Sequence, residues 1–217
     1  MDRIICIRRI KSILSLCVAL LISIQIYALQ IDVRTYQFFG EQPYTELYLR
    51  VDGQSVTWKD NQAMVEVLMY ISDKDSHIVH YDKFELALTT PDRSRDLLQL
   101  KRISLKPGSY TVNIEAKDLF KAANVIEMEQ RFYVSEQSSK YGISDIVPLA
   151  EIRKDSSTSL LVKNGFYMEP LAYHYVDTSR HQINLYLECY QQSELNQDVY
   201  LQYAVIEGDP KSPAHTI

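Results

Sequence analysis

Apolar and polar residues alternate along most of the chain beyond residue 30. The clearest alternating runs are YTELYLRV, KFELAL, LLQLKRISL, YTVNIEAK and VIEMEQRFYV, at 44–51, 83–88, 97–105, 110–117 and 125–134. Alternation over about five to nine residues is the pattern of a strand with one buried face. With IDVRTYQFF and MVEVLMYIS, these runs predict about seven strands within roughly a hundred residues.

Residues typical of turns separate the runs, at 52–53, 72–75, 90–92 and 107–108. Short strands at this spacing predict an all-β chain, in which residues 29–135 form an antiparallel β-sandwich of immunoglobulin-like type. DLFKAAN, at 118–124, fits one helical turn or, better, a connection between strands.

The segment SLKPGSYTVNIEAKDLF, at 104–120, is the clearest prediction of a turn followed by a strand. Pro107 fixes φ and Gly108 permits a positive φ, so the pair predicts a turn that enters a strand. Tyr110 follows the turn in the position of a tyrosine corner, whose hydroxyl bonds back to the backbone upstream. We therefore interpret these three residues as structural.

A second group of alternating runs follows a Ser-rich stretch, which predicts a linker at 136–142. The group includes INLYLECYQ and VYLQYAVIE, and it predicts a second β-domain at 143–217. Asn164 and Gly165 predict a tight hairpin, because a type I′ turn requires positive φ at both central residues. The ending GDPKSPAHTI has the composition of a turn and completes no strand. We therefore expect the chain to stop before this domain or its parent protein is complete.

The first 28 residues have the layout of a secretory signal peptide. Basic residues precede an apolar run from Ile13 to Ile26, and Ala28 follows. A charged start, an apolar segment and a small residue are the three parts of such a signal. We expect cleavage after Ala28 and export to the periplasm or cell envelope of a Gram-negative bacterium. The alternative is an uncleaved signal that anchors the chain, although the run is shorter than the roughly 20 residues of a spanning helix.

Charge and cysteine content narrow the classes of partner. Removal of the signal takes away four basic residues and Asp2, so the formal charge falls from −5 to −8. An acidic chain disfavours nucleic acid and electrostatic docking on an anionic membrane. Membrane contact is expected only through an uncleaved signal.

Cys189 is the one cysteine outside the signal, so no internal disulfide is available. It shares a face of its strand with Ile183 and Leu185. This placement predicts a buried, inert thiol, and an exposed reactive thiol is the alternative.

The sequence carries no catalytic signature. A Gly-x-Ser-x-Gly elbow, a phosphate-binding loop and a Gly-rich dinucleotide fingerprint are all absent. His80 and Asp82, in SHIVHYD, would share one face of a strand, but a metal site needs more ligands converging on one point. We therefore predict no catalytic residue, no metal site and no cofactor, and a protein that is not an enzyme.

Tyrosine is unusually frequent, with 16 Tyr against 6 Phe and 1 Trp. Exposed tyrosines on a sheet stack on sugars or anchor protein partners, and tyrosine also suits strands in its own right. Tyr186, Glu188 and Tyr190 are expected on the strand face opposite to Cys189. This polar, aromatic face is a candidate partner surface, or simply the second face of a sandwich strand.

One long segment resembles a known family. In TTPDRSRDLLQLKRISLKPGSYTVNIEAKDL, a Thr-Thr-x-Asp turn precedes a Leu-rich strand, and Pro-Gly-x-Tyr and an Asp-Leu exit follow. This order resembles the N-terminal β-domain region of exported Bacteroidetes proteins named for a Gly-Trp-x-Thr-Asp motif, as do VEVLMYISD, YGISDIVPLAEI, LVKNGFYMEP and INLYLECYQ. The naming motif is absent, since Lys-Asp follows Trp58 and no Gly precedes it. The resemblance implies export and tandem β-domains, with the naming domain beyond residue 217, and it implies no activity or ligand residues.

These observations together predict an exported, non-enzymatic β-sandwich protein that acts as an interaction or scaffold module. Its expected partners are other envelope proteins or further domains of a longer parent chain. The alternative is a carbohydrate-binding module that uses exposed tyrosines, with a glycan as its ligand.

Overall fold

The computed structural model describes residues 28–39, 42–136, 141–171, 182–191 and 200. All regular structure in these ranges is β-strand, and the paired strands are antiparallel. The all-β fold predicted from the alternation is therefore confirmed. The described ranges contain no helix that is long and apolar enough to cross a bilayer. The predicted signal peptide lies outside them, apart from Ala28.

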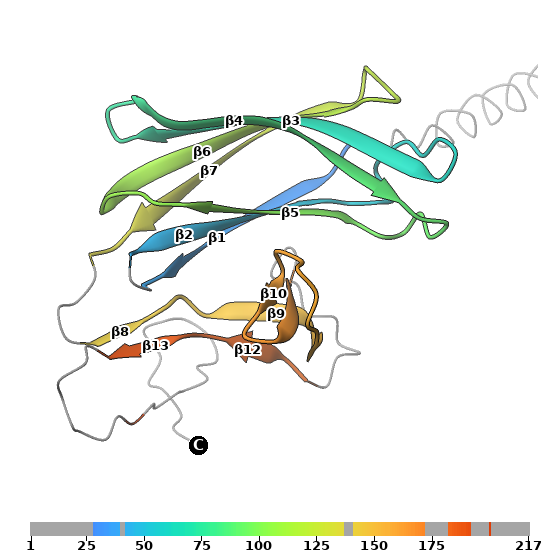
Figure 1. Ribbon diagram of the computed structural model, residues 1–217. Helices are drawn as coiled ribbons and strands as arrows, with labels where there is room; N and C mark the ends of the chain where they lie inside the picture. Colours follow the sequence, from blue (N-terminus) through green and yellow to red (C-terminus); the bar gives the residue numbers. More distant parts are fainter. Residues whose placement is uncertain (1–27, 40–41, 137–140, 172–181, 192–199, 201–217) are drawn as a thin grey trace, which may run out of the picture.

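The first seven strands form a β-sandwich of two antiparallel sheets, with strand orders β1-β2-β5 and β4-β3-β6-β7 (Figure 1). Their bounds are Ile31–Phe38 (β1), Tyr44–Val51 (β2), Gln62–Asp73 (β3), Ile78–Thr89 (β4), Leu97–Ile103 (β5), Gly108–Asp118 (β6) and Val125–Val134 (β7). The fourth strand pairs with β3 and not with β5. The fourth strand therefore belongs to the sheet of β3, β6 and β7. In a constant-type immunoglobulin domain the fourth strand belongs to the other sheet, with the first, second and fifth strands. The immunoglobulin-like character stays a prediction.

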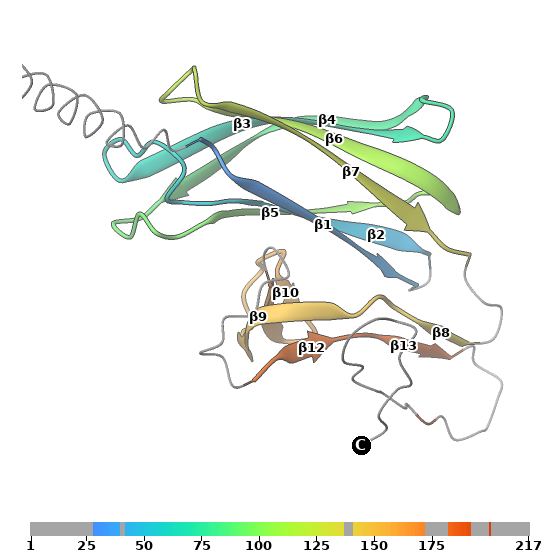
Figure 2. The same ribbon diagram turned by 180° about the vertical axis from the view of Figure 1, so that it is seen from behind.

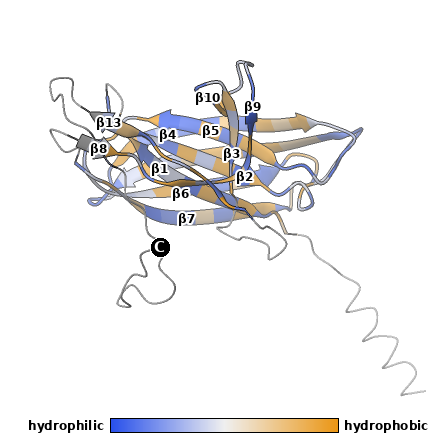
Figure 3. Cartoon of the chain, turned by 90° about the horizontal axis from the view of Figure 1, so that it is seen from below, coloured by the Kyte–Doolittle hydropathy of each residue, from blue (hydrophilic) through white to orange (hydrophobic). Residues whose placement is uncertain are grey.

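Alternation determines which side chains each strand buries. Along β3, every second residue from Ala63 to Ile71 is at most 1% exposed, and the residues between them lie on the outer face. Apolar side chains of both sheets meet in a single core, and the alternation is visible as blue and orange positions in Figure 3. Each fully buried aliphatic side chain contributes about 1.5–3 kcal/mol to stability. The outer face of the four-stranded sheet is left with polar and aromatic side chains.

A second unit follows the sandwich. Its strands are Tyr141–Ile143 (β8), Val147–Lys154 (β9), Val162–Lys163 (β10), Phe166–Pro170 (β11), Asn184–Tyr186 (β12) and Cys189–Gln191 (β13). They form two sheets, β10-β11-β9-β12 and β13-β8. β8 begins inside the stretch that the sequence assigns to a linker, and the run at 183–191 is divided into two strands. The run at 199–207 lies outside the described residues, apart from Tyr200.

The second unit lies against the outer face of the β1-β2-β5 sheet, as both views of the ribbon show (Figures 1 and 2). Tyr36 and Phe38 of β1 pack there against Val147, Leu149 and Met168. Within the part of the chain that the structure describes, the β1-β2-β5 sheet is therefore covered on both faces and the four-stranded sheet on one.

Candidate functional site

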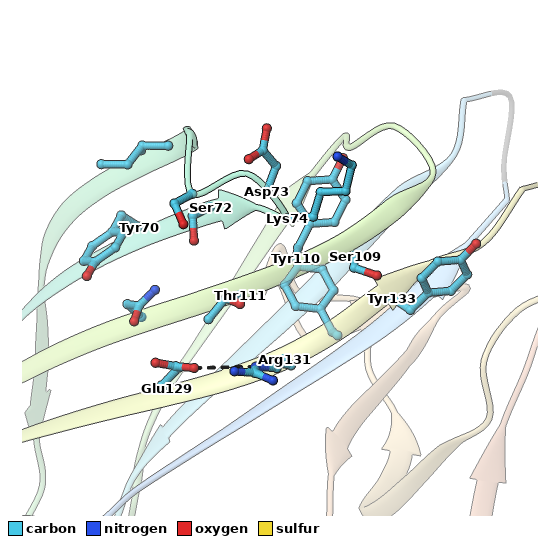
Figure 4. Close-up of a pocket in the computed structure, with 14 residues that line it drawn as sticks. Tyr70, Ser72, Asp73, Lys74, Ser109, Tyr110, Thr111, Glu129, Arg131 and Tyr133 are labelled. Carbon is cyan, nitrogen blue, oxygen red and sulfur yellow. Dashed lines mark ion pairs between the residues drawn. The ribbon is translucent and has the colours of Figure 1, made fainter.

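The open face of the four-stranded sheet carries a groove of about 1050 Å³ (Figure 4). We call it the tyrosine groove and define it by Tyr70, Ser72, Asp73, Lys74, Ser76, Ile78, Ser109, Tyr110, Thr111, Asn113, Glu129, Arg131, Phe132 and Tyr133. Its floor comes from β3, β6 and β7, and one end is formed by the loop between β3 and β4. The floor residues are mainly the outward members of each alternating strand.

Strand register aligns these outward side chains in rows across the sheet. Tyr70 of β3 lies opposite Tyr81 of β4 on one side and opposite Asn113 of β6 on the other. Asn113 in turn lies opposite Glu129 of β7. Directly opposed residues are about 4.5–5.5 Å apart at Cβ, so the row places two phenol rings beside an amide and a carboxylate.

A second row lies one step along the strands. Ser72 pairs with Thr111, and Thr111 pairs with Arg131. The Arg131 guanidinium lies 3.7 Å from the Glu129 carboxylate, drawn as the dashed line in Figure 4. Their side chains are 85% and 58% exposed, and such surface pairs contribute little to stability. Both groups are therefore free to turn toward a ligand.

Exposed aromatic rings border the rows. Tyr133 is 64% exposed and Tyr81 is 60% exposed. A smaller hollow of about 360 Å³ shares Tyr70, Asn113 and Glu129 with the groove and continues it along β6 and β7. The surface is thus long enough for an extended ligand, with aromatic faces above a polar floor.

The loop at one end of the groove brings Asp73, Asp75 and His77 together, with potential ligand atoms within 4.8 Å of one another. The Asp73 carboxylate accepts the backbone N–H groups of His77 and Asp75, each at 2.9 Å. The bond from His77 contributes most to a lowered pKa of Asp73. The cluster is explained by this turn, and we assign no metal to it.

The pair His80 and Asp82 lies elsewhere. Both share a face of β4, as the sequence predicts, but this is the inward face. Asp82 is ion-paired with Lys101 at 2.7 Å, and His80 Nε2 is buried without a hydrogen-bond partner among the described residues. Neither residue lines the tyrosine groove.

A second polar cluster lies between the sandwich and the second unit, centred on Lys163. Its ammonium lies 2.9 Å from the Glu188 carboxylate and 3.4 Å from the Glu46 carboxylate. It also lies 3.5 Å from the centre of the Phe38 ring, a cation–π contact. Burial alone would lower the pKa of Lys163, but the bonds to its carboxylate partners outweigh burial and raise that pKa.

Glu46, at the base of this cluster, is 1% exposed. It accepts hydrogen bonds from Arg102 Nε at 2.9 Å and from the Tyr48 hydroxyl at 2.6 Å. Burial, followed by the adjacent Glu46 charge, raises the pKa of Tyr48 far above its ordinary value. A buried carboxylate is costly unless it is paired and hydrogen-bonded, and Glu46 meets both conditions.

The predicted partner surface belongs to this cluster. Glu188 accepts a hydrogen bond from the Tyr186 hydroxyl at 2.5 Å and another from the Tyr190 hydroxyl. Tyr186 lies beside Phe38, and Tyr190 beside Phe39. Tyr186 and Tyr190 therefore contact the first sandwich of the same chain, while Glu188 bonds to Tyr186, Tyr190 and Lys163 within the second unit.

The prediction of a buried Cys189 is wrong for the described residues, because the thiol is exposed. Ile183 and Leu185 on the same face are also exposed, at 53% and 59%. Sequence alternation separates the two faces of a strand correctly, but it does not identify which neighbour covers each of them. The polar face is the one turned toward the first sandwich.

Three residues that the sequence predicts in turns, Gly108, Asn164 and Gly165, adopt positive φ. Asn164 and Gly165 have φ of 53° and 80° and join β10 to β11, which places Lys163 at the end of its strand. Gly108 has φ of 155° at the start of β6, directly after Pro107. The Tyr110 hydroxyl donates to the backbone carbonyl of Lys106 at 2.8 Å, which is the upstream bond expected of a tyrosine corner.

Sequence reasoning did not identify the tyrosine groove. Thr111 and Asn113 are visible as the polar face of the run at 110–117, and Tyr70 and Arg131 are outward members of their own runs. The groove becomes recognisable only when the outward residues of β3, β6 and β7 are considered together. It requires the pairing of β3 with β6 and of β6 with β7, which one sequence does not provide.

Comparison with known proteins assigns this chain to no family. No protein-family model matches this chain, and a search of curated proteins finds no match.

Proposed function

We propose that this chain is an exported, non-enzymatic β-sandwich that acts as an interaction module of the bacterial envelope, with the tyrosine groove as its binding surface. The groove itself carries the proposal. It is an open surface of about 1050 Å³ on a sheet that is fixed from behind by the apolar core. A rigid sheet holds recognition side chains more accurately than a loop does.

The setting of this function is inferred from the sequence. The signal-like residues 1–28 support export, and the resemblance to the Bacteroidetes proteins named for the Gly-Trp-x-Thr-Asp motif supports an envelope location. Processing after Ala28 would leave Leu29 as the first residue. N-terminal sequencing of the protein recovered from cells tests this, and an intact Met1 in a cytosolic fraction would overturn it.

Site-specific photo-crosslinking in cells tests the groove as an interaction surface. A photoreactive residue replaces Asn113 in the groove or, as a control, exposed Ser157 in the second unit. We expect a discrete crosslinked product from position 113 only, and we expect Arg131→Glu to abolish it. Equal products from both positions, or none from position 113, would overturn the proposal.

A glycan ligand is the second candidate, and the aromatic row favours it. Tyr70 and Tyr81 lie side by side in register, and Asn113 and Glu129 continue the row with hydrogen-bonding groups. Planar tyrosine rings stack on sugar rings, while amides and carboxylates bind hydroxyl groups. A protein partner would instead be expected to meet a more apolar centre.

A glycan array with purified protein tests this candidate. We expect binding to one class of glycan, weakened about fivefold by Tyr133→Ala or Tyr70→Ala, since an aromatic contact is worth roughly 1 kcal/mol. Tyr167→Ala, in β11 of the second unit, is the matched control and should leave binding unchanged. An array without signal would remove the glycan candidate and leave the crosslinking test unaffected.

A further inference from the structure

Asp118, the last residue of β6, is a fully buried carboxylate at the end of the sandwich where β1 begins. It is 0% exposed and accepts backbone N–H bonds from Thr57 at 2.8 Å, Phe120 at 2.9 Å and Lys121 at 3.2 Å. Among the described residues, no lysine, arginine or histidine forms an ion pair with it. Hydrogen bonds from neutral groups satisfy its oxygens, but a buried charge is normally also paired with an opposite one.

The side chain of Asn124 connects this carboxylate to the start of the first strand. Asn124 is buried, and its Nδ2 donates to the Asp118 carboxylate at 3.4 Å and to the backbone carbonyl of Ser55 at 3.2 Å. Its Oδ1 accepts the backbone N–H of Leu29 at 2.8 Å. The Leu29 nitrogen is therefore separated from the Asp118 carboxylate by a single amide group.

Burial changes abruptly at Leu29. Ala28 is exposed, whereas Leu29 is 1% exposed and belongs to the apolar core. The next residue is held as well, since the Gln30 N–H donates to Ser55 Oγ at 3.0 Å and the Gln30 carbonyl accepts the Asp52 N–H at 3.0 Å. The peptide bond between Ala28 and Leu29 thus marks the boundary of the fixed chain, and it is the bond at which the sequence predicts cleavage.

Hydrolysis of this bond would change the charge of the Leu29 nitrogen. The C–N bond breaks, and the products are a carboxylate on Ala28 and an amine on Leu29. The water molecule supplies the oxygen of the carboxylate and the hydrogens that convert the amide nitrogen to an ammonium. An α-amine has an ordinary pKa of about 7.7–8.0, so it is mainly charged at pH 7. The ammonium retains a hydrogen to donate to Asn124 Oδ1, and departure of the exposed Ala28 opens its other side to water.

We propose that Asp118 and Asn124 form a binding site for the N-terminal ammonium of Leu29, which is created when a peptidase cuts the chain after Ala28. This inference rests on the export proposed above, because it requires a cut at this bond. The uncut chain makes the hydrogen bond to Asn124 without the positive charge. The cut therefore provides a counter-charge for a buried carboxylate that has none among the described residues, and attraction between charges is stronger in the interior than in water. Processing stabilises the sandwich through this pair.

Two forms of the chain from Leu29 to Ile217 test the site. One has a free amine, and the other is acetylated at this nitrogen by semisynthesis, which keeps the N–H donor and removes the charge. We expect the midpoint of thermal unfolding to be about 4 °C higher for the free amine. Asp118→Asn, which keeps the shape of the side chain and removes its charge, should abolish this difference.

The matched control is Asp75→Asn, at an exposed carboxylate beyond the other end of β3, and it should leave the difference unchanged. Equal midpoints for the free and acetylated forms of the unaltered sequence would overturn the proposal. A difference that persists in Asp118→Asn would overturn it as well, because the ammonium would then be stabilised by another group.

The reactivity of the amine gives a second measurement, because Asp118→Asn by itself could prevent folding. The free-amine form of the unaltered sequence is treated with acetic anhydride in buffer and in urea, and modification of the N-terminal peptide is followed by mass spectrometry. We expect the reaction to be about tenfold slower in the folded protein, because a neighbouring carboxylate keeps the amine protonated and only the neutral amine reacts. The exposed Lys154 amine is the internal control and should react at similar rates in both states. Similar rates for the N-terminal amine would overturn the proposal.

N-terminal sequencing of the protein from cells separates this inference from the proposed function. A mature chain that begins at another residue would overturn the site and the predicted cleavage together, and the crosslinking test of the tyrosine groove would be unaffected. A mature chain that begins at Leu29, with equal midpoints for the free and acetylated forms, would overturn the site alone.

Discussion

The two faces of the β1-β2-β5 sheet are buried against different kinds of surface. The inner face meets the four-stranded sheet in a core of aliphatic side chains, including Leu47 and Leu49. The outer face meets the second unit through aromatic and apolar side chains, including Phe38 and Met168, and also through the paired charges of Glu46 and Lys163. One strand, β2, supplies both sets in alternation.

This difference separates two kinds of stabilisation. Aliphatic burial is non-directional and scales with area, so the inner core responds to changes in side-chain volume. The outer interface depends on paired charges and hydroxyl groups at fixed distances, so it responds to the loss of one partner and to pH. We expect the second unit to loosen under conditions that leave the sandwich intact.

The largest effect is expected from a cavity in the inner core. Leu49→Ala should lower the free energy of unfolding by about 3 kcal/mol, because it removes a large buried side chain and leaves a void. Urea unfolding monitored by circular dichroism measures this. Leu119→Ala, at a residue 36% exposed, is the control and should cost less than half as much. Equal losses would argue that the inner face is not the main core.

A smaller effect is expected from the charge at the outer interface. Lys163→Met keeps most of the side-chain volume but leaves Glu188 without its ammonium partner and Glu46 with Arg102 as its remaining ion-pair partner among the described residues. We expect a loss of about 2 kcal/mol, since removal of one member of a buried pair leaves an uncompensated charge. Hydrogen exchange should increase in β9–β12 and stay unchanged in β3 and β6. The control is Lys154→Met, at an exposed position of β9. Faster exchange throughout the sandwich would contradict the separation of the two interfaces.

The sequence predicts the parts of this molecule that depend on local rules. Strand positions follow from alternation, and the hairpin at Asn164 and Gly165 follows from the need for positive φ. Tyr110 after Pro107 and Gly108 predicts a bond to the upstream backbone, and the hydroxyl does donate to a carbonyl four residues earlier. Each of these features is determined by residues close together in the chain.

Features that depend on strand pairing were not predictable in the same way. The tyrosine groove combines Tyr70, Asn113 and Glu129, which lie in three runs brought together only by the order β3-β6-β7. The face of Cys189 was misassigned because alternation distinguishes two faces without naming the neighbour of either. The polar face is partly buried against the first sandwich, and Lys163, from a different strand, neutralises Glu188 there.

Tyr110→Phe tests a single hydrogen bond in the inner core. We expect it to lower the free energy of unfolding by about 1 kcal/mol, the net contribution of one intramolecular hydrogen bond. Tyr110 is a member of the apolar core, so its hydroxyl bond to Lys106 is a directional contact within a largely non-directional region. Thermal unfolding of the two proteins measures the loss. Tyr133→Phe, at a ring 64% exposed, is the control and should leave the midpoint unchanged. An unchanged midpoint for Tyr110→Phe would show that only the packing of the ring matters.

The smallest effect is expected from pH, and it should be confined to the outer interface. Burial alone would raise the pKa of Glu188, but hydrogen bonds from two tyrosine hydroxyls and the Lys163 ammonium outweigh burial and hold that pKa below its ordinary 4.5. Stability from this group is therefore present above pH 4.5 and is lost as the pH falls through the lowered value. The raised pKa of Lys163 has the opposite sign, so its contribution is complete below pH 10.5 and is lost as the pH rises through the raised value.

The variant Glu188→Gln tests this dependence, because it preserves the shape of the side chain and removes its charge. At pH 7 the wild-type second unit should be more resistant to urea than the variant, and the difference should diminish as the pH is lowered below 4.5. Glu127→Gln, on the exposed outer side of β7, is the control and should show no such convergence. A difference that persists unchanged at low pH would mean that Glu188 acts through its shape and not its charge. The two faces of the β1-β2-β5 sheet would then differ in composition but not in their response to acid.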